Sequence, residues 1–323
     1  MSELRFQVVS SYGLGNTQAI NTVKRISEID TNIYNNIIFD FTKFLENNPF
    51  NILLIANAIN EFCVNNIGKI SASIIAKGNN DFLSHLGFYD LINVDFGKKL
   101  GEAVANNNYV PITKIKLDGD FYNNIEEQAN KLSNLLNFDN DLQEFLKFSF
   151  TETIRNAYEH AMTSEVYVCA QKWATKDLVE IAIVDRGRGV ARAMSRKFKD
   201  KTELQLMELA LMPGVSAQTN HKFLSVDDYW RNSGYGLYAL DKLAEKYGGS
   251  FIICSGGVAI FKASNAERKL STLFRGTAIS VRIRTNTNNN FNQIRKQVIL
   301  DGQNEAKNIT YAIKKASKSS GGL

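Results

Sequence analysis

The sequence has few of the residues that cross-link a chain, stiffen it or hold it in a membrane. Its 323 residues include three cysteines and three prolines. Cys63, Cys169 and Cys254 lie far apart and form no CxxC pair, which argues against a disulfide scaffold or a zinc site. No apolar run approaches the roughly 20 residues of a membrane helix, and residues 1–10 lack the basic start and apolar run of a signal peptide. We therefore expect a cytoplasmic protein.

Charge is moderate and unevenly placed. The net charge is +5, and residues 141–285 hold 21 Lys and Arg against 16 Asp and Glu. This excess suits a polyanion such as a nucleotide, but it is too sparse for the dense Lys/Arg stripe of a nucleic-acid-binding surface. Neither a nucleic acid nor a membrane is expected as a partner. The basic end of the sequence, KKASKSSGGL, is interpreted as a solvated tail.

Apolar patterning predicts an α/β protein with two domains. In residues 1–118, strand patterns alternate with helix patterns. The strands are expected at 4–10, 32–42, 69–77 and 109–117, and the helices at 48–66 and 80–92. In residues 119–285, helices are expected at 122–138, 141–162 and 236–248, and strands at 165–173, 178–185, 250–264 and 276–284. Residues 286–323 are expected to form a basic tail with a weak terminal helix.

Residues 151–161 read TETIRNAYEHA and predict a helix with two different faces. At about 100° per residue, Glu152, Asn156 and Glu159 fall on one side. Apolar residues such as Ile154 fall on the other side, which is fit for a core. The polar side is compatible with a functional site, but by itself it is also what an ordinary surface helix shows.

The stretch IVDRGRGV, residues 183–190, places an acid at the end of an apolar strand. Asp185 is poorly solvated there unless a donor reaches it, and the exocyclic amine of a purine would serve. Gly187 and Gly189 let the backbone turn and approach a ligand closely. Taken alone, the stretch also fits a plain turn with an Asp cap.

Two further stretches place glycines at the start of an element. RNSGYGLYAL puts Gly234 and Gly236 before a helix, where backbone N–H groups and the helix dipole favour an anion. FRGTAIS opens a strand with Gly276 and Thr277. Each pattern alone is weak evidence.

In this order the four stretches resemble the N, G1, G2 and G3 boxes of the GHKL ATP-binding superfamily. That superfamily comprises gyrase, the ninety-kilodalton heat-shock chaperone, histidine kinases and MutL. The resemblance covers residues 122–285 and includes a variable lid at about 190–231. The family does not use a Walker A motif, and the sequence has none. The resemblance implies a Bergerat-type α/β sandwich, with a mixed sheet and helices on one face, that binds ATP and Mg²⁺.

The resemblance also implies a role for each matching residue. Asn156 would ligate the Mg²⁺ that bridges the phosphates. Asp185 would accept a hydrogen bond from the adenine amine, and Thr277 would join the water network around adenine. Glu152 would align or deprotonate the water that attacks the γ-phosphate. The remaining nucleotide-binding residues would be Glu159, Gly187, Gly189, Gly234, Gly236 and Leu237.

The chemistry stays open at this point. The main expectation is an ATPase that acts as a nucleotide-driven switch in signalling or anti-phage defence. The box ending His160-Ala161 is similar to that of anti-sigma-factor serine kinases, so phosphate transfer to a partner protein is the alternative. A module that holds ATP without hydrolysing it is the third. His160 is expected to have a positional role, and neither His85 nor His221 has the sequence context of a phosphoacceptor.

Two further parts of the chain are expected to act together with the ATP-binding site. Residues 1–118 resemble a STAS-like domain, the fold of anti-sigma antagonists, and would contact a protein partner or a second copy. The lid would close over the nucleotide, and one or two of its basic residues would reach the phosphates. These basic residues are Arg192, Arg196, Lys197, Lys199, Lys201, His221, Lys222 and Arg231.

Overall fold

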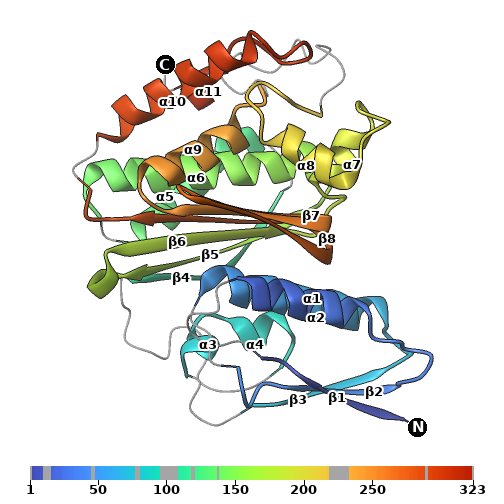
Figure 1. Cartoon of the computed structure of the whole chain (residues 1–323). Helices are drawn as coiled ribbons and strands as arrows, with labels where there is room; N and C mark the ends of the chain where they lie inside the picture. Colours follow the sequence, from blue (N-terminus) through green and yellow to red (C-terminus); the bar gives the residue numbers. More distant parts are fainter. Residues whose placement is uncertain are drawn as a thin grey trace.

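The computed structural model describes most of the chain (Figure 1). The described residues are 2–9, 16–44, 48–76, 81–94, 108–117, 121–136, 138–217, 233–287 and 290–321. Within them the strands form two sheets, one in the order β1-β2-β3 and one in the order β4-β5-β6-β8-β7. None of the described helices has the length and apolar character needed to cross a bilayer. An α/β architecture is therefore confirmed.

The small sheet is built from a β-α-β-α-β run. Its elements are β1 (Glu3–Gln7), α1 (Thr17–Ser27), β2 (Asn36–Asp40), α2 (Pro49–Asn65) and β3 (Ser71–Ile75). The strands pair in parallel, with Phe39 of β2 between Phe6 and Ile74 of its neighbours. Parallel neighbours need a crossover connection, and α1 and α2 supply it. The sequence analysis predicted the three strands and α2 but not α1.

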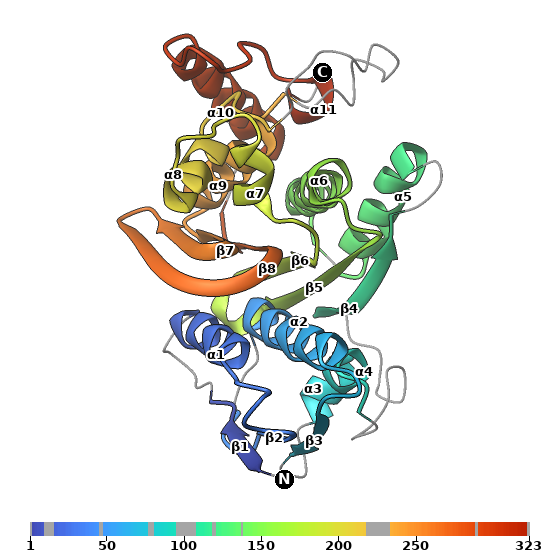
Figure 2. The same ribbon diagram turned by 90° about the vertical axis from the view of Figure 1, so that its right-hand side faces the viewer.

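Helix α2 is mostly apolar and is buried over most of its length, because it lies between two sheets (Figure 2). Pro49 occupies its first turn, where a missing N–H costs nothing. Residues 49–60 are all buried. Side chains such as Leu53 and Ile55 each contribute roughly 1.5–3 kcal/mol on burial. After β3, Gly87 at φ 82° separates α3 (Asp81–His85) from α4 (Phe88–Leu91), where one helix was predicted.

The large sheet is antiparallel throughout its described strands. They are β4 (Tyr109–Lys116), β5 (Glu165–Trp173), β6 (Leu178–Asp185), β7 (Ser250–Ala263) and β8 (Ala266–Arg284). The expectation of a mixed sheet is therefore wrong, and short turns between β5 and β6 and between β7 and β8 explain why. β4, which the sequence analysis placed in the first block, pairs with β5. The domain boundaries at 118 and 285 themselves stay predictions.

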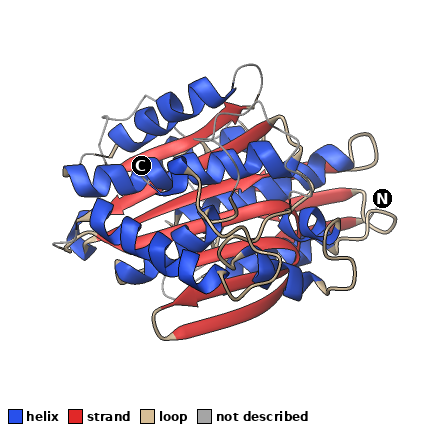
Figure 3. Cartoon of the chain, turned by 90° about the horizontal axis from the view of Figure 1, so that it is seen from above, coloured by secondary structure: helices blue, strands red, loops and turns tan. Residues whose placement is uncertain are grey.

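Helices cover both faces of the large sheet, and those on the second face come from residues 1–118, outside the unit for which helices on one face were expected (Figures 1 and 2). One face carries α5 (Phe121–Asn134), α6 (Asn140–Asn156) and α9 (Gly236–Lys246). Figure 3 shows from above how helices lie over the strands. The other face packs against α1 and α2 in one shared core, to which β5, β6 and β7 contribute Tyr167, Val184 and Ile252. The chain thus stacks sheet, helices, sheet and helices.

The end of the sequence is packed onto the molecule, which corrects the interpretation of a solvated tail. α10 (Phe291–Ala306) lies over α9 and α6 and buries Phe291 and Val298. The Phe291 ring contacts the rings of Phe145 and Phe148 on α6. A short helix follows, α11 (Lys318–Gly321). The sequence analysis gave weight to the basic residues of this region and therefore overlooked its buried apolar positions.

Candidate functional site

One pocket lies between the large sheet and the helices α6, α7 (Val190–Ser195) and α9. Five separate segments line it, and four of them carry predicted site residues. The predicted residues among its lining are Asn156, Asp185, Gly189, Gly234, Gly236, Leu237 and Thr277. Most of the other lining residues are apolar, including Ile183, Met194 and Ile279. Glu152, Glu159 and Gly187 do not line it. An apolar slot with a few polar groups is the usual form of a small-molecule site.

Asp185 is the buried acid of this pocket. It ends β6 directly opposite Thr277 of β8 and is 5% exposed. Burial raises the pKa of its carboxyl group to about 6, although donors from Gly187 and Thr277 counteract the shift. The Gly187 N–H donates to Oδ1 at 2.8 Å. Because a carboxylate offers about four lone-pair sites, it can accept one more donor from a ligand.

Asn156 lies where the helix changes its geometry. α6 ends at Asn156 and continues as a π-helical turn, η1 (Ala157–Ala161). Such turns interrupt the regular repeat and occur frequently at functional sites. The Asn156 Nδ2 atom is buried and has no hydrogen-bond partner among the described residues. This amide N–H group at the pocket wall is therefore available to donate to a bound molecule.

Two glycines are required by the close approach of neighbouring groups. Gly189 has φ 80°, and a Cβ there would lie 2.5 Å from Ser255 Oγ. That hydroxyl accepts from the Val190 N–H at 3.0 Å and fixes the start of α7. At Gly236 a Cβ would lie 2.3 Å from Glu152 Oε2. The first turn of α9 therefore touches the carboxylate of Glu152.

Glu152 belongs to a buried ion-pair network rather than to the pocket wall. Arg155 Nη2 donates to Glu152 Oε2 at 2.5 Å, and Arg155 Nε lies 3.8 Å from Glu159 Oε1. The side chains of Glu152 and Arg155 are each 1% exposed. Glu152 and Glu159 thus share one arginine instead of both facing a nucleotide.

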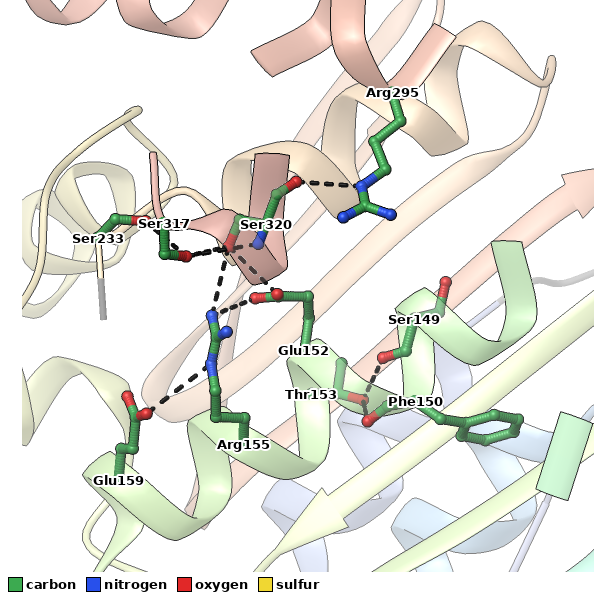
Figure 4. Close-up of polar contacts among 10 residues, drawn as sticks. All are labelled: Ser149, Phe150, Glu152, Thr153, Arg155, Glu159, Ser233, Arg295, Ser317 and Ser320. Atoms are coloured by element: carbon green, nitrogen blue, oxygen red, sulfur yellow. Dashed lines mark hydrogen bonds and ion pairs between the residues drawn. The ribbon is translucent and has the colours of Figure 1, made fainter. Parts of the chain in front are cut away.

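Helix α11 seals the other side of Glu152 (Figure 4). The Ser320 hydroxyl donates to Glu152 Oε1 at 3.2 Å, and Ser320 is fully buried. Ser317 Oγ donates to Ser320 Oγ at 3.1 Å, and Ser233 Oγ to Ser317 Oγ at 3.4 Å. Hydrogen bonds through Ser320, Ser317 and Ser233 therefore connect the carboxylate to the segment that contains Gly234.

Positive charge gathers on and before α7. Burial, together with the nearby Arg196 and Arg192, lowers the pKa of Arg188. Three guanidinium groups close enough to repel one another favour binding of an anion. Of the lid residues named above, His221, Lys222 and Arg231 lie outside the described residues. The described part of the lid forms α7 and α8 (Glu203–Ala210).

The described residues contain no group of three or more His, Cys, Asp or Glu side chains that could hold a metal ion. A magnesium ion at this site would rely on Asn156 and on oxygen atoms of a bound phosphate and of water. Mg²⁺ commonly binds in this way, with few protein ligands.

The pocket is connected to the first sheet through Arg186, which follows Asp185. Its Nε donates to Asn57 Oδ1 at 2.8 Å and its Nη1 to Asn60 Oδ1 at 2.7 Å. Both asparagines lie on α2. Arg275, next to Gly276 at the start of the last box, lies near Glu61 of the same helix at 3.9 Å. Helix α2 thus contacts two of the loops that border the pocket.

Comparison with known proteins adds no family. No family model matches the sequence, and no curated protein matches it. The functional argument therefore depends on the geometry of this chain.

Sequence reasoning missed Arg155 and Ser320. Arg155 could have been found, because it stands three residues after Glu152 and four before Glu159, which is the spacing of side-chain ion pairs on a helix. Ser320 had no such signal. It lies 168 residues from Glu152 and sits in a segment whose charge suggested solvent.

Proposed function

We propose that residues 119–285 form a GHKL-type module that binds ATP with Mg²⁺ in the cytoplasm, hydrolyses it slowly and acts as a nucleotide-driven switch. The observation that supports it is the convergence of four segments, separate in sequence, on one pocket that contains a buried acid. Seven of the ten residues expected to contact the nucleotide line this pocket. An ordinary surface helix with unrelated turns would not bring them together.

The base of the nucleotide would lie against the sheet. Asp185 would accept a hydrogen bond from the exocyclic amine of adenine, and Thr277 would hold the water beside it. Ile183, Met194 and Ile279 would enclose the ring. An amine donor would also relieve the cost of ionising a carboxyl group in this buried position.

The phosphates would lie at the start of α9. Gly234 and Gly236 would present backbone N–H groups to them, assisted by the helix dipole. Asn156 would hold Mg²⁺ through its amide oxygen, and the ion would neutralise phosphate charge. Arg188 and Arg192 supply further positive charge near α7. These groups suit a polyanion and not a neutral ligand.

Slow hydrolysis follows from the surroundings of Glu152. As general base, its carboxylate would need access to water. Arg155 holds one of its oxygen atoms and Ser320 the other. Water can reach Oε1 only after Ser320 moves away.

Isothermal calorimetry with a non-hydrolysable ATP analogue tests the proposal. We expect binding in the presence of Mg²⁺, and weaker binding both without the ion and for Asp185→Asn. Steady phosphate release from ATP should be lost in Glu152→Gln while the analogue still binds. Absence of heat with the wild-type chain would reject the ATP site. Binding without any turnover would favour a non-hydrolysing module.

The contact between Ser320 and Glu152 favours protein phosphorylation as a second candidate function. A serine hydroxyl beside a carboxylate is the arrangement that transfer from ATP to a protein requires. Transfer of labelled phosphate to protein, in place of release to water, would distinguish a kinase of the anti-sigma type from an ATPase.

The first sheet would serve a protein partner or a second copy of the chain, as the resemblance to STAS-like domains suggests. Three apolar side chains, Ile33, Val64 and Ile67, are between 51% and 78% exposed. They precede β2 and β3 at the same end of the small sheet, where Asn36 pairs with Ser71. Partners in signalling or defence would contact this end. A pull-down with and without the ATP analogue tests whether nucleotide alters that contact.

A further inference from the structure

Ser320 and Glu152 form a nucleophile and base pair inside the protein (Figure 4). The Ser320 hydroxyl donates to Glu152 Oε1 at 3.2 Å while Arg155 holds Oε2 at 2.5 Å. Arg155 thereby fixes the carboxylate with Oε1 directed at Ser320. A hydroxyl group bonded to a positioned base is the usual form of an activated serine.

The same serine is connected to the segment that would hold phosphate. Ser317 Oγ donates to Ser320 Oγ, and Ser233 Oγ donates to Ser317 Oγ. Ser233 immediately precedes Gly234. Gly236 lines the pocket and lies so close to Glu152 that a Cβ at this position would collide with the carboxylate. Pocket, base and hydroxyl therefore meet at the first turn of α9.

We propose that Ser320 is a phosphoacceptor and that the chain phosphorylates itself there. This inference rests on the proposed function, since ATP in the pocket supplies the phosphoryl group. The Ser320 Oγ attacks the γ-phosphorus as its proton passes to Glu152 Oε1. The new Oγ–P bond forms, the bond to the β,γ-bridging oxygen breaks, and ADP leaves with that electron pair. Arg155 and Ser317 are positioning residues, because each acts through Glu152 or Ser320.

The product cannot stay where the serine was. A phosphoserine carries nearly two negative charges at neutral pH. It would lie beside the carboxylate of Glu152 in a fully buried position, and Arg155 is already shared between Glu152 and Glu159. The Arg295 Nε atom donates to the Ser320 carbonyl oxygen, at 3.1 Å. Phosphorylation therefore releases α11 and opens Glu152 to water.

Intact mass spectrometry of the full chain tests this inference. Purified protein is incubated with ATP and Mg²⁺, and peptide sequencing then locates any added phosphoryl group. We expect one group on Ser320, at a rate independent of protein concentration because the reaction is intramolecular. Ser320→Ala and Glu152→Gln should both abolish it. The matched control is Ser195→Ala on α7, a serine bonded to the Arg192 carbonyl, which should retain it.

Calorimetry with the ATP analogue on the same samples separates the two levels of the argument. Analogue binding without phosphorylation of Ser320 would overturn this inference and leave the ATP site intact. Phosphorylation at another residue, retained in Ser320→Ala, would overturn it as well. Absence of analogue binding would remove the proposed function and this inference together.

Discussion

Asp185 and Thr277 face each other across β6 and β8, and both reach the floor of the pocket. The strands pair in register from Leu178 to Asp185, so the sheet itself fixes the acid beside its hydroxyl partner. The position of Asp185 therefore depends on the sheet and not on a loop. Donors from Thr277 in β8 and from Gly187 just after β6 keep the carboxyl group oriented so that it can accept one further hydrogen bond.

The pKa of Asp185, raised from 3.8 to about 6, predicts two opposite dependences on pH. In the absence of ligand, the folded state binds its proton more tightly than the unfolded state. Stability should therefore fall by up to about 3 kcal/mol as pH rises from about 4 to about 6. ATP affinity should rise over the same range, because adenine needs the ionised carboxylate. Urea unfolding and calorimetry at several pH values check both.

Asp185→Asn serves as the matched control, since the amide does not titrate. Its affinity for ATP should be weaker at pH 7 and nearly independent of pH between 5 and 7. A wild-type affinity that stays flat across this range would contradict the adenine role of Asp185.

Asn156→Ala should remove the dependence of ATP affinity on Mg²⁺. The amide oxygen is the protein ligand proposed for the ion, and its loss leaves only phosphate and water oxygens. Titrations with magnesium and with EDTA measure the effect. Thr153→Ala, a change in a pocket residue one turn away, should preserve the metal dependence. Equal responses of the two variants would argue against a role for Asn156.

Arg155→Met should lower the free energy of unfolding by about 3–5 kcal/mol, because two buried carboxylates lose their common partner. Chemical denaturation measures the change. Lys131→Met removes an exposed pair with Glu127 on α5 and should leave stability within experimental error. A similar small effect of both changes would contradict a stabilising role for the buried ion pairs of Arg155.

Arg186→Ala should uncouple the first sheet from the pocket. Its guanidinium joins the residue after Asp185 to Asn57 and Asn60 of α2. Hydrogen exchange should show that the ATP analogue protects α2 in the wild type and not in the variant. Arg275→Ala is the comparison, because Arg275 is 71% exposed and its pair with Glu61 is long. If the analogue protects α2 equally in the wild type and in Arg186→Ala, Arg186 does not couple the pocket to the first sheet.

Elements with a strong local pattern were predicted well. The strands at residues 165–173 and 178–185 have the predicted bounds, because alternating apolar residues and a tight turn specify both. Helix α6 follows its cap at Asp139, whose side chain accepts from the Leu142 N–H. The π-helical turn after Asn156 carries no such local signal and was therefore not predicted.

Contacts between residues far apart in the sequence could not be predicted. The predicted residues of the pocket wall come together, but one partner of Glu152, Ser320, lies 168 residues away. A weak helix was expected after residue 286, but the packing of α10 was not, because its buried residues, such as Phe291, are recognisable only against the aromatic rings of α6. Parallel pairing of the small sheet likewise depends on helices that cross between strands.

The position of α2 between the two sheets has a consequence during translation. A ribosome completes α2 at Asn65 and reaches β5, at Glu165, about 100 residues later. At ordinary elongation rates this delay is roughly 5 to 20 seconds. During that interval one apolar side of the nascent helix has no covering strand. Newly made chains should therefore need a chaperone such as a ribosome-bound holdase until the second half emerges.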